Sequence, residues 1–482
     1  MSTTTPPQAS SWTVEPVAFH GGSAPPDLAL DSAGVPHVLY CPPGDVRYAV
    51  RSSSGWVDEH IVNTIFGGVC GELAMGPGGV PHVTTPTVTG VLKELYGTKT
   101  GGVWDLAPYP GGLLDGVSAK GEPQVVTYWK LDTDLFSFRY LTLANGAWRH
   151  EEVETFAAPS VRGSAWASLV LDAQDNPHVL YYDEVRGDVR YALRDAAGWR
   201  VEVVEHVGAI GAVGRQGGLA LDAQGNPHGV YVIRTQPQRL DTFYATKTSA
   251  GWTKELLTAD RGGGYDPAIA VDPSGTPKVA YHDLAIIDAS RFLFDLDLVY
   301  ATRVAGTWVT EVAYGEGVLV QVQFVSLAVD FCGNPHIAFY LAGAPTAPHG
   351  VYYATKGAPC GHTSPADLTH EAVARIKALK EQAIDRGDER FVRSLDRAEE
   401  HVWKSLGYKH PFSPREVTAD LGADVSARDG GTHAVALALG PSWRAKLPSY
   451  TTLRLTWANG DVTTIDLPRG WPKKDLHAHA RP

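Results

Sequence analysis

The sequence has little that would place the chain in a membrane or on nucleic acid. No apolar run approaches the ~18 residues that a membrane-spanning helix needs, and the N-terminal stretch MSTTTPPQASSW lacks the basic start and apolar centre of a signal peptide. Lys and Arg form no run, and the formal net charge is −12, which disfavours binding to phosphates. We therefore expect a soluble protein with no membrane insertion and no nucleic-acid partner, either cytoplasmic or exported with its leader removed.

Methionine and cysteine are also rare, with 2 and 4 residues respectively, whereas turn-forming residues are plentiful. The 51 Gly and 33 Pro indicate a chain with many turns. At 482 residues the chain is long enough for two or three domains, or for one large repeat array with an appendage.

A repeated unit accounts for most of the chain. Each copy consists of an apolar strand ending in Asp, a tight turn, a Pro-His pair that opens an aromatic strand, a Tyr-Ala strand and a Trp-led strand. Residues 169–204, LVLDAQDNPHVLYYDEVRGDVRYALRDAAGWRVEVV, form the clearest copy. Seven copies align at intervals of 42 to 58 residues on Pro36, Pro81, Pro123, Pro177, Pro227, Pro277 and Pro335. Four short strands in a period of this length predict a β-propeller rather than a helical solenoid.

The seventh copy lacks the Trp-led fourth strand, and the N-terminal segment supplies one. The copy stops after GVYYATK, at residues 350–356, while WTVEPV at residues 12–17 matches WRVEVV at residues 199–204. We therefore predict that the N-terminal strand is the outer strand of the last blade, which closes the ring and leaves no open edge. The predicted fold class is all-β, a seven-bladed β-propeller followed by a helical hairpin and a small β-rich C-terminal segment.

On these residues the chain resembles the seven-bladed β-propeller superfamily, and specifically bacterial repeat proteins built from D-x-x-G-x-P-H-x-x-Y units. The resemblance covers residues 12 to 356. It implies the fold and leaves the activity open, because propellers of this shape serve as lectins, hydrolases, lyases and scaffolds. The sialidase Asp-box, S-x-D-x-G-x-x-W, differs, since the Asp turn here runs into Pro-His. Sialidase chemistry is therefore not expected.

Six segments are predicted. They are a disordered N-terminus (1–11), the propeller (12–356), a linker (357–364), an αα-hairpin (365–410), a small β-hairpin-containing segment (411–470) and a disordered tail (471–482). Residues 364–367, SPAD, form a helix start, and Asn459-Gly460 is a strong turn signal between two strands. Because two amphipathic helices cannot bury their apolar stripes alone, we expect them to dock on the propeller or on a partner.

The histidines after Pro are predicted to be structural. They are His37, His82, His178, His228 and His336, with Gln124 and Lys278 in the other two copies. Since they lie on separate blades, we expect each to bond the Asp, or in copy three Ser118, that ends the preceding strand. Copy two breaks this rule, because Gly76 stands opposite His82. The residue two before each Pro is Gly or, once, Asp175, so a positive φ is predicted there. The Trp and the Tyr of Tyr-Ala are predicted to pack between blades.

No metal and no cofactor are expected. The pairs Asp132-x-Asp134 and Asp295-x-Asp297 resemble fragments of calcium loops, but neither continues as a complete loop. Of the four cysteines, the repeat places Cys41 with Cys70 and Cys332 with Cys360. Two disulfides would suit an exported protein, and four reduced thiols would suit a cytosolic one; both alternatives remain open.

Function is expected in the loops where the copies differ, on the upper face, where the second strands end and one blade leads to the next. Arg162, Arg215 and Arg261 fall in consecutive blade-to-blade loops, each beside Gly. They predict a clamp for a carboxylate, sulfate or phosphate. Separate solvated arginines are the alternative.

A second group of candidates lies at the ends of two second strands. Tyr182 and Asp183 end one, and His282 and Asp283 end another. His282 or Tyr182 is the candidate for moving a proton, although neighbouring side chains on a strand point apart, so His282 and Asp283 are not expected to form a dyad. An exposed loop histidine is the alternative. The remaining predicted ligand-binding residues are Trp166 and Arg186.

The predicted function is ligand binding, with a glycan or protein recognised through the upper-face loops and lost on changing Arg215 or Trp166. The first alternative is a polysaccharide lyase or glycoside hydrolase acting on an acidic glycan, in which the arginines neutralise uronate or sulfate. The second alternative is an intracellular scaffold. Binding is favoured because no nucleophile motif, carboxylate pair or metal triad is evident.

Overall fold

The computed structural model divides the chain into two compact units, Met1–His362 and Thr363–Pro482. The residues it describes are 12–20, 24–64, 70–85, 94–132, 135–157, 166–183, 185–207, 217–236, 239–248, 250–258, 264–288, 293–315, 320–343, 347–357, 415–420, 451–456 and 462–467. Among them no helix is long and apolar enough to cross a membrane.

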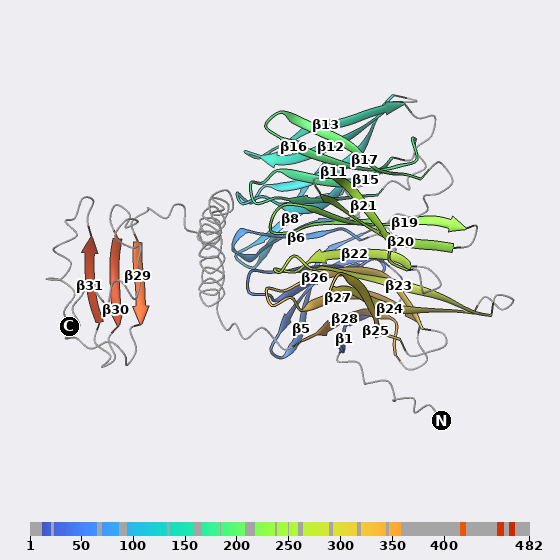
Figure 1. The fold of residues 1–482 in the computed structure, drawn as a ribbon. Coiled ribbons are helices and arrows are strands. Elements are labelled where there is room, and N and C mark those ends of the chain that lie inside the picture. The colour runs from blue at the N-terminus through green and yellow to red at the C-terminus, as the bar shows by residue number, and fades with distance from the viewer. Residues whose placement is uncertain are drawn as a thin grey trace. The chain divides into compact units, whose positions relative to one another are not determined.

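Short antiparallel sheets make up the described part of the first unit (Figure 1). The first sheet contains β2 (Asp27–Leu30), β3 (Pro36–Tyr40), β4 (Asp45–Ser52) and β5 (Gly55–Asn63). The second contains β6 (Leu73–Gly76), β7 (Val80–Thr85), β8 (Leu95–Thr100) and β9 (Val103–Pro108), with a 3-10 turn, η1, at Pro77–Gly79. The third contains β10 (Leu113–Val117), β11 (Pro123–Asp132), β12 (Leu135–Ala144) and β13 (Ala147–Ala157).

Two further four-stranded sheets and one larger sheet follow. The fourth contains β14 (Ala167–Leu171), β15 (Pro177–Asp183), β16 (Asp188–Asp195) and β17 (Gly198–His206). The fifth contains β18 (Gly217–Leu221), β19 (Pro227–Gln236), β20 (Arg239–Thr248) and β21 (Gly251–Leu256). The larger sheet contains β22 (Gly264–Val271), β23 (Pro277–Asp288), β24 (Leu293–Val304), β25 (Thr307–Tyr314), β26 (Gln321–Val329), β27 (Pro335–Gly343), β28 (Gly350–Lys356) and β1 (Trp12–Phe19). Its two halves pair with each other through the parallel strands β24 and β26, at Leu296 and Gln321.

This all-β arrangement of small antiparallel sheets is consistent with a β-propeller. The repeat proline stands at the start of each second strand, second in β7 and first in the others. The innermost strands contact one another in order, and β26 contacts β2. The sequence pattern therefore predicts the strands correctly, because the turn and the Pro mark the same boundary in each copy.

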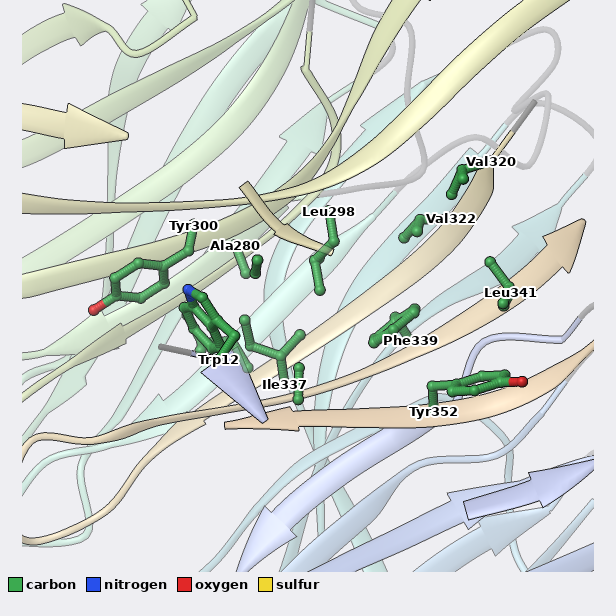
Figure 2. Packing of buried hydrophobic residues seen from close by; sticks show 13 residues of the cluster. Trp12, Ala280, Leu298, Tyr300, Val320, Val322, Ile337, Phe339, Leu341 and Tyr352 are labelled. Carbon is green, nitrogen blue, oxygen red and sulfur yellow. The ribbon is translucent and has the colours of Figure 1, made fainter. Parts of the chain in front are cut away.

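The N-terminal strand pairs as predicted. β1 is antiparallel to β28, with Trp12 opposite Lys356 and Phe19 opposite Gly350. Trp12 is buried in a cluster with Ile337 and Tyr300, and its ring centroid lies 5.2 Å from that of Tyr300 (Figure 2). An indole side chain supplies the apolar area that holds an isolated terminal strand in place.

In five copies an Asp fixes the turn before the second strand, whereas Gly76 and Ser118 stand at this position in the second and third copies. The Asp172 Oδ1 accepts hydrogen bonds from the backbone N–H groups of Gln174 at 2.8 Å and Asn176 at 2.9 Å. Asp175 has a φ of 60°, and the Gly at the equivalent position of the other six copies has a φ of 73° to 83°. The predicted positive φ is therefore present in all seven copies, which explains the choice of Gly and Asp.

The histidine after Pro has a different principal partner from the one predicted. The His228 Nδ1 lies 2.6 Å from the Tyr244 hydroxyl, whereas its Nε2 lies 3.6 Å from Asp222. The same pair of contacts recurs at His37, His178 and His336. Gln124 bonds to the Tyr140 hydroxyl and to the Glu122 carbonyl, so the prediction that it bonds Ser118 is wrong. The tyrosine hydroxyl of the third strand therefore provides a nearer hydrogen-bond partner than the turn.

The tyrosine of each third strand also packs edge-on against the Trp of an outer strand in the adjoining copy, as predicted for the five Tyr-Ala tyrosines. The pairs are Tyr48–Trp104, Tyr96–Trp148, Tyr140–Trp199, Tyr191–Trp252, Tyr244–Trp308, Tyr300–Trp12 and Tyr353–Trp56. In most copies the Trp indole and a neighbouring cation also bind a Glu of the preceding outer strand. Thus Trp308 Nε1 donates to Glu255 at 3.0 Å, and Arg303 pairs with the same carboxylate. We call the Tyr–Trp pair, together with the cation and the Glu that bind at it, the inter-sheet latch.

The innermost strands are joined by side-chain acceptors. Asp27 Oδ2 accepts the Leu73 backbone N–H at 2.7 Å, and Asp115 Oδ2 accepts that of Leu169 at 2.6 Å. Glu72, Ser168, Asp266 and Ser326 make the equivalent bond to the next innermost strand. Burial, opposed by the Leu169 bond and reinforced by the Asp27 charge, raises the pKa of Asp115 to about 7.

Cys41 and Cys70 form a disulfide, which decides one of the two alternatives for this pair. Cys332 is disulfide-bonded too. The remaining cysteine, Cys360, lies outside the described residues.

Replacing both Cys41 and Cys70 by Ser is expected to lower the free energy of unfolding by about 3–4 kcal/mol, because the bridge closes a loop with a sequence separation of 29 residues. Urea unfolding with and without reductant measures the change, and the variant should respond less to reductant than the native chain. Four titratable thiols in native protein purified under oxidising conditions would contradict the bridge.

The second unit is described only in three strands. β29 (Arg415–Asp420) is parallel to β30 (Thr451–Thr456), which is antiparallel to β31 (Val462–Leu467). The pairing of β30 with β31 confirms the predicted hairpin. The predicted αα-hairpin (365–410), the linker beyond Gly357 and the predicted disordered ends (1–11 and 471–482) lie outside the described residues.

Candidate functional site

The predicted arginine clamp falls largely outside the described part of the chain. Arg162, Arg215 and Arg261 are not among the described residues. The clamp therefore stays a prediction, and the site must be built from the neighbouring strands.

Asp183 and Arg186 are held in an ion cluster at the end of β15. The buried Asp183 Oδ2 lies 2.6 Å from the Arg186 Nη1, and its Oδ1 accepts backbone N–H bonds from Val185 and Arg186. Glu154 pairs with Arg186 at 2.9 Å and with Arg190 at 2.6 Å. Each charge has an opposite partner here, which is the arrangement of a structural network.

Trp166 and Tyr182 are buried in one apolar cluster. The six-membered ring of Trp166 occupies the space above Gly217, where a Cβ would come within 2.4 Å of the ring. The hydroxyl of Tyr128 donates to the Tyr182 carbonyl at 3.1 Å. The ligand-binding and proton-moving roles predicted for these two residues stay predictions, and their burial leaves little side-chain surface for a ligand.

His282 lies in a pocket. The pocket measures about 350 Å³ and is lined by Tyr265, His282, Leu284, Leu296, Gln321 and Gln323. His282 belongs to β23 and is only 7% exposed, so the alternative of an exposed loop histidine is wrong. β23 runs on to Asp288 and β24 begins at Leu293, so both strands extend well beyond His282.

The imidazole is held between an aromatic ring and a carboxyl group. Tyr265 stacks on His282 with ring centroids 5.3 Å apart and an interplanar angle of 1°. The Nδ1 of His282 lies 3.4 Å from the Asp266 Oδ2. Asp283 sits next in the strand, opposite Asp297 and Gly264, so His282 and Asp283 form no dyad, as expected from strand geometry.

Burial shifts the pKa of both groups. Desolvation lowers the pKa of His282 to about 4, which keeps the imidazole neutral at pH 7. Desolvation also raises the pKa of Asp266 to about 7, although the Phe324 N–H bond opposes the shift. Burial raises the pKa of Tyr265, with the Arg234 charge acting against it. The pocket is therefore lined by a neutral imidazole, and that imidazole contacts a carboxyl group whose pKa is raised by burial.

Two irregular strands create this arrangement. The register of β22 shifts between Tyr265 and Ala268, and that of β26 shifts between Gln323 and Val325. Asp266 and Phe324, inside the shifts, have φ values of 51° and 53°. The Phe324 N–H donates to the Asp266 Oδ2 at 3.2 Å, which ties one bulge to the other. Bulges commonly redirect side chains beside sites, and positive φ at non-Gly residues is costly unless the surroundings enforce it.

Tyr265, Asp266, Gln321 and Gln323 are absent from the set predicted from sequence. One signal was available for Asp266, because a carboxylate on an otherwise apolar innermost strand also occurs at Asp27 and Asp115. The glutamines carry no signal of their own. In the part of the chain that the structure describes, no group of three or more His, Cys, Asp or Glu side chains could hold a metal ion.

The fold and the pocket thus define an all-β protein of the propeller type with a polar-aromatic pocket. No protein-family model matches the chain, and no curated protein matches it. Among solved structures, it resembles a polysaccharide lyase of a new family, the PL25 ulvan lyase bound to -[GlcA(1-4)Rha3S]- (12% identity, 74% of this chain, 98% of that chain, TM-score 0.47). It also resembles YCF48 from Cyanidioschyzon merolae (11% identity, 72% and 99%, TM-score 0.45) and the SapL1 lectin in complex with alpha methyl fucoside (13% identity, 62% and 98%, TM-score 0.39). At such identities and scores the likeness carries no functional argument, so function must be argued from the site.

Proposed function

We propose that residues 12–356 form a closed seven-bladed propeller that binds a glycan in the Tyr265–His282 pocket. Supporting the ring, the Tyr–Trp latch pairs run in one cycle through the sheets, and the pair Tyr353–Trp56 links the last sheet to the first. A closed ring removes exposed sheet edges and makes a rigid support for a site.

The lining of the pocket carries the proposal. Tyr265 offers an aromatic ring, Gln321 and Gln323 offer amide donors and acceptors, and His282 is a neutral imidazole. Sugars present both apolar C–H faces and hydroxyl groups, so such a mixed lining suits them. A protein that serves only as a scaffold does not need a polar pocket, so the lining favours ligand binding over the scaffold alternative. The Cys41–Cys70 bridge also argues against the intracellular alternative, because disulfides persist in oxidising compartments.

Replacing His282 by Ala is expected to weaken glycan binding about tenfold or more, because one buried hydrogen-bonding group is lost. Affinity electrophoresis in gels containing polygalacturonate, heparin, laminarin or galactomannan measures the change. The matched control is His206→Ala on β17, since the His206 side chain is 72% exposed and pairs only locally with Asp188. Equal retardation of the native chain and both variants would contradict a role for the pocket.

A second candidate function is elimination or hydrolysis of an acidic glycan. The specific observation in its favour is the 3.4 Å contact of the His282 Nδ1 with Asp266, which leaves Nε2 as the nitrogen available to a ligand. A neutral Nε2 can accept the proton α to a uronate carboxyl group, and Arg234, whose charge acts on Tyr265, is a cation close to the pocket.

Turnover of polygalacturonate, followed by the ultraviolet absorbance of unsaturated product or by reducing ends, tests this candidate. Activity should rise with pH as His282 loses its proton around pH 4, and His282→Ala should abolish it. If the protein binds acidic polysaccharides but forms no product from any of them, the catalytic candidate is wrong and only the binding function remains.

A further inference from the structure

A second hollow lies on other sheets and belongs to neither the arginine loops nor the His282 pocket. It measures about 680 Å³ and is lined by Glu94, Pro108, Tyr109, Pro110, Gly111, Gly112, Thr127, Tyr128, Trp129 and Trp148. These residues come from the second and third sheets and from the segment that joins them. We call it the Trp129 cleft.

Trp129 breaks the repeat in a way that packing does not explain. It stands six residues after the repeat Pro, where Asp183, Ile233, Asp283 and Leu341 are all buried, yet Trp129 is 42% exposed. The guanidinium carbon of Arg139 lies 5.4 Å from its ring centroid. The guanidinium therefore lies over one face of the indole, while a large part of the Trp129 side chain stays exposed to solvent. A large aromatic ring presented to solvent and backed by a cation is typical of a binding platform.

The opposite side of the cleft is held in a fixed shape. Gly112 has a φ of 134°, and a Cβ there would come within 2.6 Å of the Val126 carbonyl oxygen and 2.9 Å of the Thr127 Cβ. The Tyr109 hydroxyl donates to the Gly112 carbonyl at 3.0 Å. Segment 110–112 therefore lies close against β11 and cannot be moved without losing these contacts. Volume, preformed walls and a few polar groups among aromatic ones are the properties of a small-molecule site.

We propose that the Trp129 cleft is a second carbohydrate subsite and that it takes an uncharged pyranose. The apolar face of the sugar would stack on the exposed part of the Trp129 ring, and its hydroxyl groups would donate to Glu94 and exchange bonds with Thr127. A carboxylate at the rim of a chain with a net charge of −12 repels uronate and sulfate groups. The inference rests on the proposed glycan-binding function but depends on different residues.

The test is affinity electrophoresis of the full chain in gels containing neutral laminarin or galactomannan, or acidic polygalacturonate or heparin. Trp129→Ala is expected to reduce retardation by the neutral chains about tenfold, and Trp129→Phe to retain part of it, because a smaller ring still stacks. Phe19→Ala is the matched control, since Phe19 is 59% exposed but lies on β1, outside the cleft. Trp129 is exposed, so neither substitution should change the melting temperature.

The outcomes separate the two proposals. If Trp129→Ala binds the neutral chains like the native protein while His282→Ala is weakened, the cleft is not a subsite and the proposed function stands. If only Trp129→Ala is weakened, the cleft stands and the Tyr265–His282 pocket is wrong. If the native chain is retarded by none of the four polysaccharides, both proposals fail. If the cleft binds a proline-rich peptide but binds no neutral polysaccharide, the subsite proposal is also wrong.

Discussion

Replacing Tyr244 by Ala is expected to lower the free energy of unfolding by about 3–5 kcal/mol, the cost of removing a large buried aromatic side chain. Tyr244 is 1% exposed, and its ring packs against Trp308 with centroids 5.0 Å apart. The Arg303 guanidinium lies 5.3 Å from the same ring. The substitution therefore opens a cavity and releases one side of the inter-sheet latch. Urea unfolding followed by near-ultraviolet circular dichroism measures the loss.

Tyr244→Phe separates the hydroxyl from the ring. It keeps the packing but leaves the buried His228 Nδ1 without the hydroxyl at 2.6 Å, which is expected to cost about 1–3 kcal/mol. The control is Val304→Ala on β24, where the side chain is 56% exposed and the change should stay within about 0.5 kcal/mol. A loss below about 1 kcal/mol for Tyr244→Ala would show that the latch does not hold the sheets together.

Replacing Asp115 by Asn is expected to stabilise the protein at pH 8, on the order of 2–4 kcal/mol, given about 1.4 kcal/mol per unit of pKa shift. The pKa of Asp115 rises from 3.8 to about 7 on folding, mainly through burial. Between these values the folded state keeps a proton that the unfolded state releases, so stability falls as pH rises from about 4 to 7. Asn cannot ionise, and its carbonyl oxygen can still accept the Leu169 N–H.

The two proteins should therefore melt alike near pH 4 and diverge toward pH 8. The charge of Asp115 also raises the pKa of the buried Glu72, after burial itself, so the substitution relieves a second carboxylate. Asp272→Asn is a control of opposite sign. Burial raises the pKa of Asp272, but bonds, among them those from Ser274 and Thr276, lower it by more, so the net shift is downward. The stability that the Asp272 carboxylate contributes is therefore present above the unfolded pKa and lost in acid. A parallel pH profile for native protein and Asp115→Asn would contradict the shift.

The strands and turns were open to prediction because their causes are local. In five copies the Asp, the positive-φ residue and the Pro lie within six residues of one another, and they fix the turn by themselves. The place of the N-terminal strand was also predictable, because Trp12 and its neighbours match the missing fourth strand. The partner of Gln124 was not, because the Tyr140 hydroxyl lies sixteen residues away, on the next strand.

The site was less predictable. His282 was singled out because no other copy has His at that position, and the pocket includes it. Asp266, Tyr265 and the two glutamines come together only because two bulged strands are tied by one bond, and a bulge leaves no clear mark in a single sequence. The sequence could show that Trp129 differs from the residues at the same position in other copies. It could not show that Trp129 is exposed or that Arg139 lies over its ring.

The sequence by itself thus determined the repeat, the strand order within it and the turn chemistry. It also determined the scaffold role of the Pro-His, Tyr and Trp positions. All of these features depend on contacts inside one copy or between identical faces of adjacent copies. Only the tertiary structure decided which polar residues meet. The pocket of His282 draws side chains from both halves of the larger sheet, and the cleft of Trp129 draws them from two sheets. Residues that are far apart in the sequence become neighbours there only when bulges and glycines set the distance between the strands.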